Sequence, residues 1–386
     1  MANFNQLDEL LRGFAGKTVP GCGCAVAKNG EILYEGYYGM ADIEAGKPVT
    51  PDTIYRLFSM TKVIICTAAM MQFERGKFLL NEPFYEYFPE YRHTKVFERE
   101  GNGNYHVREA KSPMLVRDTF NMAVGLPYPG RQHPTDVMMN EIRAKLDKEK
   151  NGKYTLQDDV RAMGEVPVRF DPGTQWLYGF GHEMVAAMIE VTSGMTVGEY
   201  LKKEIFEPLG MDSTGYRFFG DTRERMITMY RPEDGTFKRS EGFFDARHEP
   251  DAVYEAGGAG LFSTVRDYTK FAQMLANGGV YKGERIIGRK TIDLMRRNML
   301  SPQMLKDFNN PYLEGYGYGL GVRTMMEPAG VTNMSVGEFG WTGAAGTWAS
   351  IDPSEGVSVI YMHQTMPNNE YYHHHRVRSV AYGSLE

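Results

Sequence analysis

Ser59 and Lys62 stand three residues apart in the stretch Leu57-Phe58-Ser59-Met60-Thr61-Lys62. A serine hydroxyl is a weak nucleophile until a neighbouring base takes its proton. Burial disfavours the charged form of a lysine and so makes the amine available as that base. Residues 63–71 carry no charge, which favours a buried helix with both side chains on one face. The pair therefore predicts nucleophilic catalysis; the alternative is that Ser59 caps the helix and Lys62 extends into solvent.

Two further stretches carry groups that this chemistry would use. In Phe170-Asp171-Pro172-Gly173-Thr174-Gln175-Trp176-Leu177-Tyr178-Gly179, Tyr178 follows a turn and precedes an apolar helix, where a tyrosine near a lysine can relay a proton. In Gly340-Trp341-Thr342-Gly343-Ala344-Ala345-Gly346, small residues let a ligand approach a strand closely. A strand N–H there would complete an oxyanion hole with the N–H of Ser59. The alternatives are a buried tyrosine with a satisfied hydroxyl and a glycine-rich strand packed on a helix.

The elements that must position these groups follow from hydrophobic periodicity. The spacing predicts an amphipathic helix over 3–15 and strands over 22–28 and 32–39, joined by Asn29-Gly30, a strong hairpin signal. Further helices are predicted over 60–75, 115–123, 135–150, 155–163, 180–193, 197–206 and 265–277. Strands are predicted again over 317–322, 338–341, 346–351 and 356–363. Residues 92–112, rich in Gly, Asn and charge, predict an exposed loop insertion.

Strands therefore open and close the chain, and helices fill its middle. We expect an α/β fold of the α+β type, an antiparallel sheet flanked by helices with an inserted all-helical domain. The sheet domain would comprise residues 1–57 and 215–386, and the mainly helical domain residues 58–214. Ser59 would lie where the chain passes from one domain to the other, and clefts between domains often hold sites.

Composition excludes several classes of protein. The 386 residues carry a net charge of −6, which argues against nucleic-acid binding and against attraction to an anionic membrane.

The N-terminus lacks the basic and apolar regions of a signal peptide, and the apolar run 63–71 is too short to span a bilayer. Cys22, Cys24 and Cys66 are expected as free thiols in a reducing cytoplasm, Cys22 and Cys24 as core residues rather than a metal or redox pair.

Taken in order, Ser59-x-x-Lys62, the Tyr178 stretch and Trp341-Thr342-Gly343 resemble the serine β-lactamase and penicillin-binding-protein superfamily. The chain looks most like its class C β-lactamase-like branch, which includes the family VIII carboxylesterases. The resemblance covers about residues 20–363, including Gly257-Gly258-Ala259-Gly260. It implies the β-lactamase/transpeptidase-like fold with the site between the domains. The resemblance also implies that Ser59 is the acylated nucleophile, Lys62 its proton partner, and Tyr178 the general base and then the general acid. The N–H groups of Ser59 and Ala344 would form the oxyanion hole. The resemblance implies no metal or organic cofactor.

Three departures from the family's motifs indicate the substrate. Trp341 stands where carboxylate-binding members carry a cation, whose hydrogen bond to a carboxylate is worth roughly 1.5–3 kcal/mol. Phe180 stands where true β-lactamases carry asparagine, and Asn121-Met122-Ala123-Val124-Gly125-Leu126 replaces His-Thr-Ser-Gly-Leu. All three changes make the cleft less polar. The residues predicted to bind substrate are Trp341, Thr342, Gly343, Phe180 and Met122.

The sequence therefore predicts a cytoplasmic serine esterase that acts on small-molecule esters with small or apolar acyl groups. A β-lactamase or D-Ala-D-Ala-type peptidase or amidase, an acyltransferase, and a non-catalytic binding protein are the alternatives. Whether Lys62 or Tyr178 is the base stays open, because the two would titrate as a coupled unit. The oligomeric state is not indicated.

The remaining histidines are given structural interpretations. His373-His374-His375 predict a solvated surface segment, rather than a metal site or a tag. His182 is expected to support the site or the core from the helix after Tyr178, and His363 to pack or bond locally at the end of an apolar strand.

Overall fold

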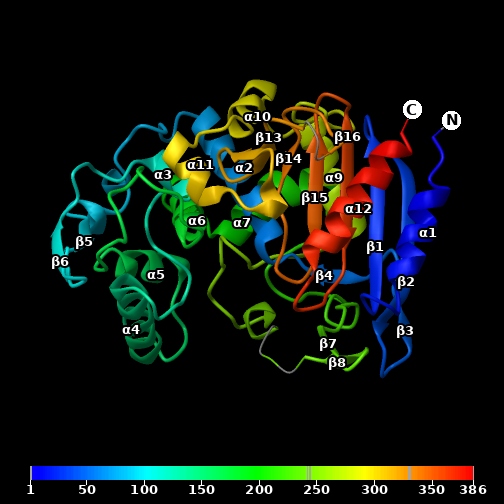
Figure 1. Cartoon of the computed structure of the whole chain (residues 1–386), viewed down its shortest axis with the longest axis horizontal. Coiled ribbons are helices and arrows are strands. Elements are labelled where there is room, and N and C mark those ends of the chain that lie inside the picture. Colours follow the sequence, from blue (N-terminus) through cyan, green and yellow to red (C-terminus); the bar gives the residue numbers. More distant parts are fainter. Residues whose placement is uncertain (1, 241, 243–244, 329–331, 386) are drawn as a thin grey trace.

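The two ends of the chain build one antiparallel sheet (Figure 1). The computed structural model describes residues 2–240, 242, 245–328 and 332–385. Within them the sheet has eight strands in the order β12-β13-β14-β15-β16-β1-β2-β3. Their bounds are β1 Gly21–Lys28, β2 Glu31–Asp42, β3 Lys47–Pro48, β12 Tyr316–Tyr318, β13 Arg323–Met325, β14 Phe339–Gly340, β15 Trp348–Asp352 and β16 Val357–Met362. The pairing of β16 with β1, from Gly23 opposite Met362 to Lys28 opposite Val357, joins the two ends.

Helices cover both faces of this sheet, and its central strands β15, β16 and β1 are buried along almost their whole length. Helix α9 (Val265–Ala276) packs on β1, β15 and β16. Helices α1 (Asn5–Phe14) and α12 (Glu370–Gly383) lie side by side on the other face (Figure 1). The predicted hairpin between β1 and β2 is confirmed: Asn29 and Gly30 take φ of +52° and +87°, as a type I′ turn requires.

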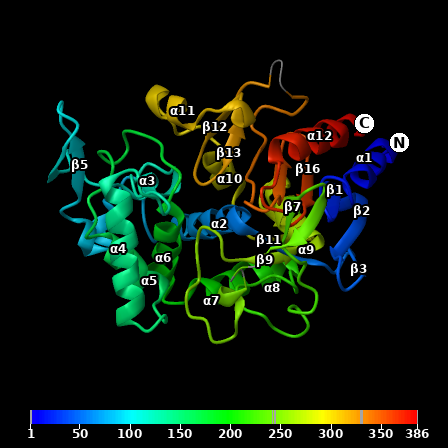
Figure 2. The same ribbon diagram turned by 60° about the horizontal axis from the view of Figure 1, so that its bottom comes forward.

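The middle of the chain is mainly helical, and α2 (Thr61–Glu74) lies at its centre (Figure 2). Every residue of α2 from Thr61 to Gln72 is buried, which accounts for the uncharged run in the sequence. Helix α6 (Gly181–Ser193) packs directly against it. The other helices are α3 Val116–Phe120, α4 Pro134–Glu149, α5 Leu156–Met163, α7 Val197–Leu201, α8 Glu207–Leu209, α10 Arg289–Met295 and α11 Pro302–Phe308. A π turn over Lys202–Phe206 follows α7, and 3₁₀ turns lie at Phe58–Met60, Phe84–Glu86, Pro89–Tyr91, Ala246–His248 and Pro311–Leu313.

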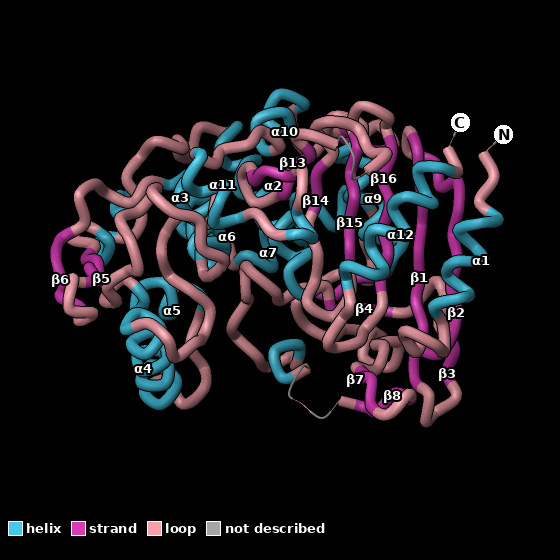
Figure 3. The backbone as a smooth tube through the Cα atoms, viewed as in Figure 1, coloured by secondary structure: helices cyan, strands magenta, loops and turns pink. Residues whose placement is uncertain are grey.

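Among the described residues, four two-stranded sheets stand apart from the main one. They pair β4 Ile54–Arg56 with β9 Phe262–Thr264, β5 Lys95–Arg99 with β6 Tyr105–Glu109, β7 Tyr230–Glu233 with β8 Thr236–Arg239, and β10 Val280–Tyr281 with β11 Glu284–Arg285. The β5–β6 hairpin corrects the prediction of a loop over 92–112, because two short strands flank the Gly- and Asn-rich turn. Figure 3 shows this hairpin at the end of the molecule away from the main sheet.

Two further predictions about the last third of the chain were wrong. The strand predicted over 317–322 is broken, because residues 319–322 turn the chain from β12 into the antiparallel β13. Helix α12 was not predicted, and its His373 and His374 are buried rather than solvated. His373 Nε2 lies 2.9 Å from Thr18 Oγ1, and the His374 ring stacks on Trp348, so these side chains fasten α12 to the sheet.

The structure confirms that the three cysteines are free and buried. The strands of the main sheet come from residues 21–48 and 316–362, and helices α2–α7 come from residues 61–201. The domain boundaries at residues 57 and 215 stay predictions. No helix in the described part of the chain is long and apolar enough to cross a lipid bilayer.

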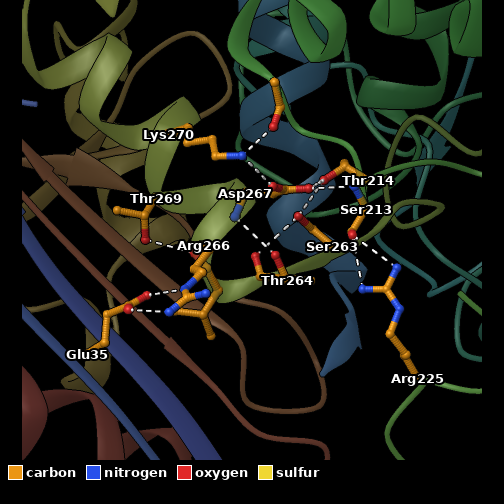
Figure 4. A network of polar contacts seen from close by, with 12 residues as sticks. Glu35, Ser213, Thr214, Arg225, Ser263, Thr264, Arg266, Asp267, Thr269 and Lys270 are labelled. Carbon is orange, nitrogen blue, oxygen red and sulfur yellow. Dashed lines mark hydrogen bonds and ion pairs between the residues drawn. The ribbon is translucent and has the colours of Figure 1, made fainter. Parts of the chain in front are cut away.

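A polar network fastens the chain where it returns from the helical region to α9 (Figure 4). Asp267, in the first turn of α9, accepts hydrogen bonds from Ser213 N at 2.8 Å and Thr214 Oγ1 at 3.2 Å. Thr264 Oγ1 caps the helix by accepting from Asp267 N, and Arg266 pairs with Glu35 of β2 through two bonds of 2.8 Å. The network ties α9 to residues 213–214 and to β2, and β9, which leads into α9, pairs with β4, the strand that leads to Ser59.

Candidate active site

Ser59 lies in the short 3₁₀ turn between β4 and α2, at the N-terminal end of the buried central helix. The preceding residue, Phe58, has a φ of +46°. Such a left-handed backbone is uncommon for a bulky residue and costs free energy, and conformations of this kind cluster at functional sites. The half-buried Ser59 side chain is therefore presented by a sharply turned segment at the junction of strand and helix.

Lys62 is completely buried, so the alternative that it extends into solvent is wrong. Its Nζ donates to Ser59 Oγ at 3.1 Å, to Tyr128 OH at 3.0 Å and to the carbonyl of Gly258 at 2.6 Å. Nζ is therefore surrounded by three oxygen atoms, one of them the Ser59 hydroxyl. The structure thus brings together Ser59 and Lys62, the pair predicted from the sequence. Lys62 is a basic side chain in direct contact with the serine hydroxyl.

A buried carboxyl group lies behind this contact. Glu183, in the first turn of α6, accepts a hydrogen bond from Gly258 N at 3.1 Å, and its other oxygen has no partner within the described residues. Burial raises the pKa of Glu183, while the charge of Lys62 opposes that rise. A Cβ on Gly258 would lie 2.6 Å from both Glu183 Oε1 and Tyr128 OH, so a larger residue here would displace both side chains.

Tyr128 is a functional candidate that the sequence reasoning missed. Burial, with the Glu183 charge as a further cause, raises the pKa of Tyr128 well above that of an ordinary phenol, so its hydroxyl stays neutral. Its loop lies against the Tyr178 loop through a bridge between Pro127 and Gly179. The signal was present, since Pro127-Tyr128 directly follows the stretch 121–126 that departs from the family's motif.

Tyr178 lines the site from the other side, with its ring centre 4.8 Å from Lys62 Nζ. Its hydroxyl accepts a hydrogen bond from Trp341 Nε1 at 3.1 Å. Within the described residues it has no hydrogen bond to Ser59 or Lys62. Asp171, at the start of the Tyr178 loop, is held by two bonds of 2.8 Å from Arg108 of β6, so the β5–β6 hairpin helps to position this loop.

The Trp341–Trp348 segment docks on the residue that precedes the serine turn. Thr347 Oγ1 donates to the carbonyl of Leu57 at 2.9 Å. A Cβ on Gly343 would lie 2.3 Å from that carbonyl and 2.1 Å from Thr347 Oγ1, so the approach requires glycine. This docking brings Ala344 and Ser59 to the wall of one cavity, while their joint role as oxyanion hole stays a prediction.

That cavity has a volume of about 360 Å³. It is lined by Ser59, Trp176, Tyr178, Asn310, Tyr312, Leu313, Arg323, Trp341, Thr342, Gly343, Ala344, Asn368 and Glu370. Of the five predicted substrate contacts, Trp341, Thr342 and Gly343 line it. Phe180 and Met122 do not: Phe180 packs edge-on against Tyr128, and Met122 is fully buried in the core. The sequence reasoning missed Asn368 and Glu370, because it did not predict the helix that they precede and begin.

His182 lies near Lys62 without contacting Ser59. Its Nε2 lies 2.9 Å from the carbonyl of Phe120, and burial lowers its pKa to about 3, so the ring is neutral. This matches the predicted supporting role. In the described ranges, no three side chains of His, Cys, Asp or Glu are grouped to hold a metal ion.

Comparisons with known proteins place these residues in a family context. A family model described as Beta-lactamase matches residues 7–382. Protein Rv1367c of Mycobacterium tuberculosis is 26% identical over 344 residues, which cover 88% of this chain and 84% of that protein. Esterase EstB of Burkholderia gladioli is 26% identical over 388 residues, covering 93% and 88%. ML-236A carboxylate methylbutanoyltransferase mlcH of Penicillium citrinum is 25% identical over 384 residues, covering 92% and 87%.

Solved structures support the same fold. EstCE1, described as a hydrolase with promiscuous acyltransferase activity, superposes with a TM-score of 0.78 at 21% identity and covers 98% of both chains. Unliganded simvastatin synthase (LovD) of Aspergillus terreus superposes with a TM-score of 0.83 at 23% identity and covers 100% of both. The β-lactamase/transpeptidase-like fold expected from the sequence is confirmed.

Proposed function

Because the chain belongs to the Beta-lactamase family, a family of serine hydrolases with esterase and acyltransferase relatives, we propose that it cleaves carboxylic esters through an acyl-enzyme on Ser59. The observation that carries the proposal is the 3.1 Å contact between Lys62 Nζ and Ser59 Oγ inside a buried cluster. A serine held against a buried amine is the arrangement that turns a weak nucleophile into a reactive one.

The steps follow from the positions of the side chains. Ser59 Oγ attacks the ester carbonyl as its proton passes to Lys62, and the N–H groups of Ser59 and Ala344 stabilise the oxyanion. The leaving alcohol takes a proton from Tyr178, whose hydroxyl lines the cavity. A water molecule then attacks the acyl-enzyme and gives a proton to the Tyr178 phenolate, and Lys62 returns its proton to Ser59 Oγ as the ester bond to Ser59 breaks and the carboxylic acid leaves. Lys62 and Tyr178 act as one proton-transfer unit, which Tyr128 positions through its contact with Lys62.

Trp341 supports an ester rather than a β-lactam or D-Ala-D-Ala-type peptide as substrate. It presents an indole to the cavity, where a substrate carboxylate would need a cation. Trp176, Tyr178 and Leu313 add apolar surface that suits a small acyl chain. The relative named esterase, EstB, agrees with this substrate class. A small-molecule ester partner and a location in the cytoplasm remain predictions from the sequence.

Acyl transfer is the second candidate function. It is favoured by the relative named as a methylbutanoyltransferase and by EstCE1, described as a hydrolase with promiscuous acyltransferase activity. The same acyl-enzyme would serve, with an alcohol replacing water in the second step.

Parallel assays of the purified protein test the proposal. Wild type and Ser59→Ala are compared on p-nitrophenyl butyrate, with and without an added alcohol, and on a chromogenic cephalosporin, with circular dichroism as the folding control. We expect ester cleavage that Ser59→Ala abolishes and slow cephalosporin turnover. A new ester formed in the presence of alcohol would establish acyl transfer, whereas faster turnover of the cephalosporin than of the ester would contradict the esterase proposal.

A further inference from the structure

One part of the cavity wall is polar, although the sequence predicted a cleft of low polarity. Glu370 opens helix α12 and lines the cavity together with Asn368 and Thr342. Its Oε2 accepts hydrogen bonds from Thr342 Oγ1 at 3.1 Å and from Asn368 Nδ2 at 3.4 Å. Its backbone N–H donates to Asn368 Oδ1 at 3.0 Å. The carboxylate is therefore fixed beside the Trp341-Thr342-Gly343 segment.

The second carboxylate oxygen of Glu370 is left for a ligand. Oε1 has no hydrogen-bond donor within the described residues, although the side chain is only partly exposed. Burial raises the pKa of Glu370, while the bonds from Thr342 and Asn368 lower it. A partly desolvated acceptor gains free energy when a ligand supplies a donor.

A positively charged side chain, Arg323, lines the same cavity. Arg323 is buried, and its Nη2 donates to the carbonyl of Ala349 at 2.9 Å and lies 3.4 Å from Glu338 Oε1. Glu338 is equally buried, and Arg323 Nη1 has no hydrogen-bond partner within the described residues. The cavity therefore presents both signs of charge: a substrate carboxylate would meet the charge of Glu370, and a substrate ammonium would meet the charge of Arg323. A neutral hydroxyl is repelled by neither of these charged groups.

We propose that Glu370 is a specificity-determining residue that accepts a hydrogen bond from a hydroxyl group of the substrate. The substrate class is then an uncharged ester that carries a hydroxyl in its alcohol part or its acyl part. This inference rests on the proposed esterase function and names the substrate chemistry of the same cavity. Trp341 and its aromatic neighbours contact the apolar part of the ester, and Glu370 selects its hydroxyl and excludes a carboxylate.

Matched esters test the proposal on the full chain. 2-Hydroxyethyl butyrate is compared with propyl butyrate, and methyl 3-hydroxybutyrate with methyl 3-methylbutyrate, so that each pair differs by a hydroxyl in place of a methyl group. Carboxymethyl butyrate supplies the anionic comparison. The values of kcat/KM are measured by titration of the released acid for wild type, Glu370→Ala, Glu370→Gln and Glu314→Gln. Glu314 is the control, an exposed carboxylate next to the cavity residue Leu313.

We expect wild type to prefer the hydroxyl ester in at least one pair by about tenfold or more, as a hydrogen bond to a charged group implies. Glu370→Ala should reduce this ratio to about one, and Glu370→Gln should improve the carboxylate ester relative to propyl butyrate. Glu314→Gln should keep the wild-type ratios. A ratio near one in both pairs for wild type, or an unchanged ratio in Glu370→Ala, would overturn the role of Glu370 while leaving the esterase in place. Wild-type failure on every ester would instead overturn the esterase proposal and this inference with it.

Discussion

The hydroxyl of Tyr128 lies 3.0 Å from Nζ of Lys62, on the same nitrogen that contacts Ser59 Oγ. The hydroxyl of Tyr178 contacts the indole of Trp341 instead, and only the ring of Tyr178 faces Lys62. The two tyrosines of the site therefore have different partners. One positions the lysine, and the other presents its hydroxyl to the cavity.

This difference predicts unequal effects of removing the two hydroxyl groups. Tyr178→Phe should lower kcat on p-nitrophenyl butyrate by about a hundredfold or more, since general acid–base catalysis contributes about 10²–10⁴. Tyr128→Phe should cost about tenfold, the scale of one hydrogen bond to a charged group. Steady-state kinetics of the two variants, with thermal unfolding to exclude misfolding, gives the comparison. A larger loss in Tyr128→Phe would make Tyr128 the proton-transfer tyrosine.

Glu183 should matter through its charge. Glu183→Gln keeps an acceptor for the N–H of Gly258 but removes the buried carboxylate whose charge interacts with Lys62. We expect kcat/KM to fall by about tenfold with little change in fold, because the Glu183 carboxylate would stabilise the positive charge that Lys62 gains when it takes the Ser59 proton. Glu190→Gln, on the same helix, is the control and should retain activity. Full activity of Glu183→Gln would mean that this carboxyl group only anchors the Gly258 backbone.

Gly343 should tolerate no side chain. Gly343→Ala would force a Cβ to within 2.3 Å of the Leu57 carbonyl, and the segment carrying Ala344 would have to move away from the serine turn. Overpacking of this kind costs about 1–3 kcal/mol, and we expect kcat/KM to fall by tenfold or more. Gly13→Ala is the matched control, because a Cβ on Gly13 of α1 meets no atom within 4 Å. Urea unfolding and ester kinetics of both variants check this, and equal behaviour would exclude a role for the close approach.

The buried side chain of His373 should make the folding stability of the protein sensitive to acid. Burial lowers its pKa from 6.5 to about 4, so between these values the unfolded chain binds a proton that the folded chain does not. Stability attributable to His373 is therefore lost as the pH falls below about 6.5, by about 1.4 kcal/mol at pH 5.5.

The variant His373→Gln isolates this contribution. Buried acids such as Asp118, whose pKa burial raises to about 6, act in the opposite direction and are common to both proteins. The free energy of unfolding in urea is measured at pH 7.5 and pH 5.5 for wild type and His373→Gln. The loss between the two pH values should be smaller in the variant by about 1.4 kcal/mol. Equal losses would show that His373 is protonated in the fold.

The fold was largely predictable because its signals are local. Asn29-Gly30 specified the hairpin, and the uncharged run after Lys62 specified the buried α2. Helix α12 was not predictable in the same way. Its residues Tyr371, Tyr372 and His373–His375 lack an apolar stripe, and the helix is stabilised by contacts with Thr18, Trp348 and other residues distant in sequence.

The residues of the candidate site were likewise only partly predictable from the sequence. Ser59 and Lys62 were found because both lie on one turn of chain, and Tyr178 and Trp341 because each begins or ends a recognisable stretch. Phe180 was wrongly placed in the cavity, because a residue two positions from Tyr178 points instead under Tyr128. Glu370 and Asn368 reach the cavity only when α12 folds back on the sheet, which no local pattern reveals.

Mass spectrometry of the enzyme during turnover tests the central claim most directly. Wild type and Ser59→Ala are mixed with p-nitrophenyl butyrate, quenched in acid within the first turnover and analysed as intact protein and as peptides. We predict that wild type gains the mass of one butyryl group, located on Ser59, and that Ser59→Ala gains none. A butyryl group on another residue, or ester cleavage by Ser59→Ala at the wild-type rate, would contradict the acyl-enzyme on Ser59.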